Sequence, residues 1–286
     1  MSKTPSRNPT TLVMQAAVLT LWLATYPCNG ESYAQTATME SGESQKDSAA
    51  LEQLRARLEA DANGQYSQAL FDALYEKWGP ETLITRFKKG ISKNPSDARG
   101  YLALGTVYER AGRFEEAVAA YRQAIQTAPR YSNAYMALGI LYGNNGKYDL
   151  ALEQLQKVTE LDPSSSDAFS NLAMTYALRG EHPKAVPLFQ KAIQLNPNNV
   201  NFYMRLGQSL IMLLRFEGAI SAYETAGRVA PNYWPAYQNL AIVYERVGNL
   251  AKARESYAHV LKLAPESASA KKELERLKST ADETSS

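Results

Sequence analysis

Between residues 98 and 265 the apolar positions recur at the spacing of amphipathic helices, and the whole pattern repeats every 34 residues. Each copy has a leucine followed by a small residue: Leu104–Gly105, Leu138–Gly139, Leu172–Ala173, Leu206–Gly207 and Leu240–Ala241. Later in each copy comes an alanine, at Ala117, Ala151, Ala185, Ala219 and Ala253, and a closing proline, at Pro129, Pro163, Pro197, Pro231 and Pro265. A period of this length predicts stacked helix–turn–helix units.

The second copy illustrates how the pattern predicts a pair of helices. Tyr135, Leu138 and Tyr142 fall at helical spacing and form one face of a first helix. Gly139 lies on the same face and has no side chain, so the second helix can approach its backbone closely. Gly146 stands where the first helix must end, because glycine readily adopts the left-handed conformation that stops helices.

The turn between the two helices has a glycine in four copies and a leucine in the other. Gly112, Gly180 and Gly248 match Gly146, whereas the fourth copy has Leu214. The left-handed conformation is costly for a residue with a Cβ atom, so we predict a different turn or some strain at Leu214. At the start of the third copy, Asp167 is predicted to accept the free N–H groups of the first helical turn.

The pattern resembles that of the tetratricopeptide repeat (TPR) family: L-G/A-x-x-Y, an alanine, an aromatic residue, a second alanine and a closing proline. The resemblance implies an all-α, right-handed α-solenoid of helix–turn–helix repeats, with repeats at residues 98–131, 132–165, 166–199, 200–233 and 234–267. Residues 48–97 are read as a cap helix and a divergent repeat, in which Leu83 and Phe87 occupy the core positions of the second helix. Residues 268–286 are read as a capping helix and a tail, with Leu274 and Leu277 packed inward.

The first 34 residues have the features of a secretion signal. Lys3 and Arg7 precede an apolar stretch at residues 12–24, and small residues at Ser32 and Ala34 predict cleavage after Ala34. The alternatives are lipidation of Cys28, an uncleaved anchor in the inner membrane, and an organellar transit peptide. Residues 35–47 are small and polar and are predicted to form a disordered linker.

Composition and residue inventory argue against chemistry in this chain. The formal net charge of +2 gives no electrostatic case for binding nucleic acid or an anionic membrane. Cys28 is the only cysteine, and the two histidines, His182 and His259, lie more than two repeats apart. No glycine-rich phosphate loop, metal-ligand cluster or activated nucleophile is present in the sequence, so we predict a protein that is not an enzyme, with no cofactor and no metal.

The resemblance implies that the first helices line a concave groove. Every methionine after residue 47 falls on positions that face such a groove, and methionine suits surfaces that accept varied apolar partners. The predicted peptide-binding residues are Met136, Ile140, Asn171, Met174, Leu178, Met204, Arg205, Gln208, Ile211, Met212, Asn239 and Ile242. Internal packing of these side chains, or their coverage by the chain's own residues 48–63, is the competing interpretation.

These observations predict an exported scaffold or adaptor that binds a peptide or helical segment of a protein partner in the groove. The expected location is the bacterial periplasm, within an envelope complex, and membrane association is expected only if the N-terminal segment stays uncleaved. The alternative is a regulatory or substrate-presenting subunit of an enzyme or secretion complex located on another chain.

Overall fold

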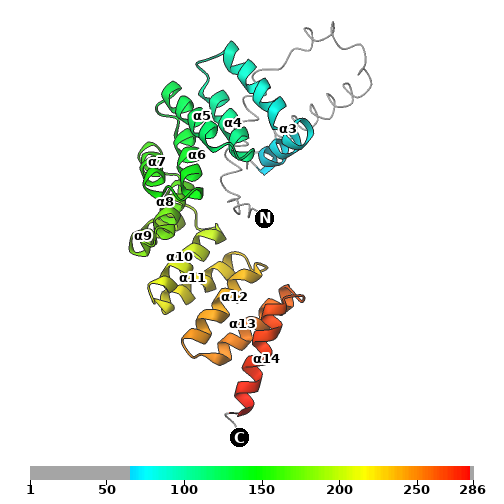
Figure 1. Cartoon of the computed structure of the whole chain (residues 1–286). Coiled ribbons are helices and arrows are strands. Elements are labelled where there is room, and N and C mark those ends of the chain that lie inside the picture. Colours follow the sequence, from blue (N-terminus) through cyan, green and yellow to red (C-terminus); the bar gives the residue numbers. More distant parts are fainter. Residues whose placement is uncertain (1–64, 284–286) are drawn as a thin grey trace, which may run out of the picture. The chain divides into compact units, whose positions relative to one another are not determined.

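The computed structural model describes residues 65–283, and this part of the chain contains twelve helices and no strand (Figure 1). The all-α prediction is therefore confirmed for these residues. The predicted signal at 1–34, the linker at 35–47 and the helix at 48–63 lie outside them. The chain divides into two compact units, whose described residues are 65–161 and 162–283; we call them unit 1 and unit 2 and describe them separately.

Unit 1 is built from a long helix followed by two helical hairpins. Its helices are α3 (Gln65–Lys93), α4 (Ala98–Arg110), α5 (Phe114–Thr127), α6 (Ser132–Asn144) and α7 (Tyr148–Leu161). Helix α4 packs against α5 and α6 against α7, while α3 packs on α4 and α5 on α6. Each helix of a hairpin thus covers the apolar face of its partner and of the next hairpin, as a stacked repeat requires.

Helix α3 is two helices joined at a kink. Gly79 has φ 69° and ψ 167°, a conformation that is open essentially only to glycine, and Pro80 follows it. Proline suits the first position of a helix, because its missing N–H would have no helical partner there. In the second half of α3, Leu83 and Phe87 are fully buried in the core of unit 1.

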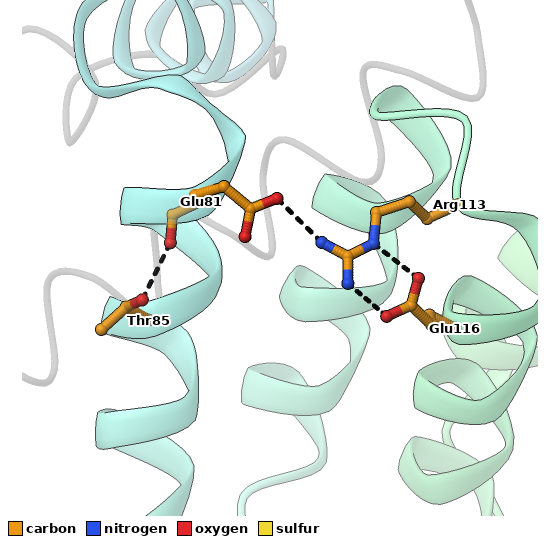
Figure 2. A network of polar contacts seen from close by, with 4 residues as sticks. All are labelled: Glu81, Thr85, Arg113 and Glu116. Atoms are coloured by element: carbon orange, nitrogen blue, oxygen red, sulfur yellow. Dashed lines mark hydrogen bonds and ion pairs between the residues drawn. The ribbon is translucent and has the colours of Figure 1, made fainter.

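A polar network joins α3 to the turn that precedes α5 (Figure 2). Arg113 donates from Nη1 to Glu81 Oε1 at 2.9 Å and forms a two-pronged ion pair with Glu116, while Thr85 Oγ1 donates to the Glu81 carbonyl. The hydrogen bond between Arg113 and Glu116 raises the pKa of the guanidinium and lowers that of the carboxyl. The network is exposed, so it fixes the position of α3 more than it adds stability.

Unit 2 contains three hairpins and a final helix. Its helices are α8 (Ser166–Leu178), α9 (His182–Leu195), α10 (Val200–Met212), α11 (Phe216–Val229), α12 (Trp234–Arg246), α13 (Leu250–Leu263) and α14 (Ala268–Glu283). Helices α8–α9, α10–α11 and α12–α13 form the hairpins, which stack through α9 on α10 and α11 on α12. Helix α14 packs on α13, and Leu277 is buried against the end of this stack.

Small residues let the two helices of a hairpin approach closely. A Cβ atom added to Gly105 would lie 2.4 Å from Cε1 of the buried Tyr121, and one added to Gly207 would lie 2.6 Å from Cε1 of Tyr223. Real Cβ atoms do not approach other heavy atoms so closely, because protein interiors are already close-packed. The glycine therefore makes room for the aromatic ring of the second helix.

The turn at Leu214 keeps the geometry of the glycine turns. Leu214 has φ +57°, close to the +75° of Gly112, and its N–H donates to the Ile211 carbonyl at 2.9 Å as the Gly112 N–H donates to Glu109. Of the two outcomes expected at this position, the different turn is wrong and the strained left-handed residue is found. Leu214 is the only non-glycine residue with positive φ among residues 65–283.

The cap at the start of α8 differs from the predicted one. The Ser165 hydroxyl, not the Asp167 carboxylate, accepts the hydrogen bond from the Ala168 N–H, at 3.2 Å. The helix begins at Ser166, so Asp167 lies inside the first turn, where its charge faces the positive end of the helix dipole.

Candidate functional site

The predicted groove residues divide between the two units. Met136 and Ile140 belong to α6 of unit 1 and are buried, at 4% and 6% exposure. The other ten residues belong to α8, α10 and α12 of unit 2, the first helices of its three hairpins. Only unit 2 therefore offers several of these side chains to a partner.

We call the predicted residues of α8, α10 and α12 the inner face of unit 2. Its members are Asn171, Met174, Leu178, Met204, Arg205, Gln208, Ile211, Met212, Asn239 and Ile242. Met174, Met204 and Ile211 are half-buried and pack against the margin of the unit 2 core. Gln208 and Ile242 are exposed, as are Leu178 and Met212 at the ends of their helices.

Polar groups interrupt this apolar surface where α8 meets α10. Arg205 donates from Nη1 to Ser170 Oγ at 3.4 Å, and Asn171 beside Ser170 is buried. Burial raises the pKa of the Asp167 carboxyl, which the charge of Arg205 partly offsets, and burial lowers the pKa of the Arg205 guanidinium, which Asp167 partly offsets. Charged groups with reduced hydration interact more strongly with a ligand than exposed ones do.

Gln238 contributes a hydrogen-bond acceptor to α12, next to Asn239. Its Oε1 is shielded from solvent and receives no hydrogen bond from residues 65–283. Buried acceptors in proteins are nearly always paired, so this acceptor is an exception among the described residues.

The described residues hold no cluster of side chains that could bind a metal ion. Within 65–283 no three His, Cys, Asp or Glu side chains lie close enough together to hold a metal ion. His182 begins α9, whereas His259 lies on α13 and stacks on Tyr237, with 4.1 Å between ring centroids. No helix in the described range has the length and apolar character needed to cross a membrane.

One group of exposed residues escaped the sequence analysis. Leu214, Val247 and Leu250 lie in or next to the turns between the paired helices of unit 2 and are well exposed. The signal was available, because the equivalent turn at residues 143–147 of the second copy (GNNGK) has no large apolar residue.

Stacked pairs of antiparallel helices, with an exposed apolar and amide-bearing surface on the first helix of each pair, define an α-solenoid of the protein-interaction class. Two tetratricopeptide repeat models match residues 176–241 and 234–267, and a model described as the cytochrome c-type biogenesis protein H TPR domain matches residues 81–199. The chain belongs to the tetratricopeptide repeat family.

Individual relatives are similar over different lengths. The cytochrome c-type biogenesis protein CycH of Bradyrhizobium diazoefficiens is 47% identical over 41 residues, which are 14% of this chain and only 11% of that protein. The crystal structure of MamA has a TM-score of 0.56 at 26% identity, covering 61% of this chain and 95% of that one. PilF of Pseudomonas aeruginosa has a TM-score of 0.59 at 18% identity, covering 74% and 95%.

A third similar structure is that of a peptide-binding protein. YrrB, described as a TPR protein with an unusual peptide-binding site, has a TM-score of 0.54 at 23% identity, over 64% of this chain and 95% of that one. At this level of identity the likeness to YrrB and PilF shows the fold alone.

Proposed function

We propose that this protein is a non-enzymatic adaptor that binds an extended or helical segment of a protein partner on the inner face of unit 2. Half-buried Met174, Met204 and Ile211 on α8 and α10, together with the exposed Ile242 on α12, carry the proposal. An amphipathic segment can cover such anchors with its own apolar face. Arg205 and Asn239 supply the polar contacts that fix the orientation of the bound segment.

The same proposal places the protein in a bacterial envelope complex. The resemblance to the TPR domain of cytochrome c-type biogenesis protein H and to a segment of CycH supports a role in the assembly of c-type cytochromes. The predicted secretion signal supports export to the periplasm, with anchoring to the inner membrane by the uncleaved segment as the alternative. In such a complex the adaptor would present one protein to another rather than carry out chemistry itself.

The experiment compares partner retention by the full chain and by a variant with two charges on the inner face. Met174→Glu with Ile242→Glu places a carboxylate on α8 and another on α12, where a bound apolar segment would have to desolvate them. Co-purification from an envelope fraction identifies the partner, and titration with that purified partner measures its affinity. We expect the double variant to lose at least about tenfold in affinity, with an unchanged thermal midpoint.

A matched control carries the same two charges on the second helices. Gln190 on α9 and Ser221 on α11 are exposed, so Gln190→Glu with Ser221→Glu should bind as the wild type does. Equal affinity of the inner-face variant would overturn the proposal, and a collapsed fold would assign Met174 and Ile242 to the core. Catalytic activity that co-purifies with the chain would instead support the regulatory or substrate-presenting subunit.

A further inference from the structure

The turns inside the three hairpins of unit 2 expose large apolar side chains. Leu178, Met212 and Leu214 are 52%, 62% and 71% exposed, and Val247 and Leu250 are each 40% exposed. The corresponding turns of unit 1, residues 108–116 and 142–150, expose one large apolar side chain, Leu150, at 39%. Their other exposed residues are small or polar: Gly112, Glu115, Glu116, Asn144, Asn145, Gly146, Lys147 and Asp149.

These turns belong to one edge of unit 2. Helices α8, α10 and α12 are the first members of hairpins that stack in the same sense, through α9 on α10 and α11 on α12. Their carboxyl ends, and the turns that follow them, therefore lie along the same edge. We call the turns at residues 176–184, 210–218 and 244–252 the turn edge.

Leu214 shows that the apolar character of this edge is not a by-product of folding. The left-handed conformation disfavours leucine relative to glycine, and the exposed side chain gains almost nothing from burial in the core. A strained residue whose side chain adds nothing to the stability of the fold indicates a role in function. Its exposed neighbours on the adjacent turns extend the surface on which such a role would depend.

The turn edge also carries an excess of exposed positive charge. Its basic residues are Arg179, Lys184, Arg215, Arg246 and Lys252, and its acidic residues are Glu181, Glu217 and Glu245. All five basic residues are exposed.

Ion pairs involve two of the three acidic residues and two of the five basic residues of the turn edge. Glu181 is paired with both Arg179 and Lys184. Glu245 is paired with Arg276 and accepts the Tyr257 hydroxyl at 2.8 Å. The net charge of +2 for the whole chain averages over this local excess and does not reveal it.

We propose that the turn edge of unit 2 docks on an anionic lipid surface. Leu214 and its apolar neighbours would enter the boundary between headgroups and acyl chains, and the basic residues would face the lipid phosphates. These apolar side chains lie on the turns and helix ends of three successive hairpins, with exposed basic residues beside them. Such a combination of apolar tips and flanking cations fits a fluid, negatively charged plane.

The test places an environment-sensitive fluorophore on the edge of the full chain. Cys28→Ser removes the only native thiol, and Leu214→Cys provides the labelling site. The probe is challenged with vesicles of phosphatidylcholine alone and with vesicles of about one part phosphatidylglycerol to two parts phosphatidylcholine. We expect a blue shift and quenching by bromolipid with the anionic vesicles only.

A second label controls for binding through other parts of the chain. Asn198→Cys puts the same fluorophore on the exposed turn between α9 and α10, at the opposite end of the helices, where no shift is expected. Residues 12–24 are common to all versions, so any affinity of that apolar stretch for lipid is common to them. Equal shifts at 198 and 214, or no difference between the two vesicles, would refute the proposal.

Binding by variants provides an independent readout. Leu214→Gly with Val247→Ser removes two of the apolar tips, and Leu214→Gly also relieves the strained turn, so the fold is kept. We expect at least about tenfold weaker partition onto the anionic vesicles. Unchanged partition would count against the lipid surface, and a silent probe at 214 would leave a protein partner as the occupant of the edge.

Discussion

Leu214 stands where four other repeats have glycine, and its strain can be measured. Replacing Leu214 with glycine removes a Cβ atom from a left-handed residue whose side chain is largely exposed. Relief of this conformation outweighs the greater entropy of an unfolded glycine, so Leu214→Gly should raise the free energy of unfolding by about 1 kcal/mol. Urea denaturation followed by circular dichroism measures the change.

The reverse substitution at an ordinary turn is the control for this prediction. Gly180 has φ +85° and no heavy atom within 4 Å of a Cβ position, so Gly180→Leu meets conformational strain without a steric clash. Its free energy of unfolding should fall by about 1 kcal/mol. A Leu214→Gly variant no more stable than the wild type would show that the turn is not strained.

Buried tyrosines predict how stability depends on alkaline pH. Burial raises the pKa of Tyr131 in unit 1 and of Tyr223 in unit 2 to about 12, from an ordinary value of 10.0. Because the folded state keeps these hydroxyls protonated while the unfolded state loses the proton more easily, their contribution is complete below pH 10 and is lost as the pH rises to about 12. Urea midpoints across this range should fall accordingly.

A phenylalanine variant isolates the contribution of Tyr223 to this dependence of stability on pH. Tyr223→Phe keeps the ring that packs on Gly207 but has no ionisable hydroxyl. Its stability should fall less steeply than that of the wild type between pH 10 and 12. Parallel curves would mean that Tyr223 ionises at its ordinary pKa.

The close approach of α10 and α11 depends on Gly207. An alanine there would place its Cβ atom against the Tyr223 ring on the facing helix, so Gly207→Ala should destabilise unit 2 by about 1–3 kcal/mol, measured by urea denaturation. Gly218→Ala, in the same repeat, meets only the flexible end of Leu210 at 3.3 Å and should be neutral or stabilising, because alanine favours helix. Equal effects of the two substitutions would contradict the close-approach argument.

Helix α14 closes the open end of the last hairpin. Leu277 is 1% exposed, and its carbonyl accepts a hydrogen bond from Arg254 Nη1 at 3.3 Å. Leu277→Ala should lower the free energy of unfolding by about 2–4 kcal/mol, because it leaves a cavity at the end of the stack. Leu274→Ala, at a half-buried position of the same helix, should cost clearly less, and hydrogen exchange in α13 reports the difference.

The predicted secretion signal determines where the mature chain begins. Cleavage after Ala34 would leave a chain that begins at Gln35 and has no cysteine. N-terminal sequencing of protein recovered from the envelope fraction is expected to start at Gln35. A chain that still begins at Met1 would favour the membrane anchor, and a lipid-modified Cys28 would favour lipidation.

The sequence by itself determined the architecture, because in a stack of repeats each repeat packs mainly on the repeats next to it in the sequence. The leucine, small-residue, alanine and proline positions therefore predicted every hairpin from α4 to α13, and Leu83 and Phe87 predicted a core in the second half of α3. The inward packing predicted for Leu277 is also confirmed.

Only the tertiary structure decided which side chains remain available to a partner. Met136 and Met212 lie at groove positions by the same rule, yet Met136 is buried and Met212 is 62% exposed. The choice of Ser165 over Asp167 as the cap is of the same kind. Exposure depends on atoms contributed by neighbouring helices, and a period of 34 residues repeats the backbone pattern without fixing those neighbours.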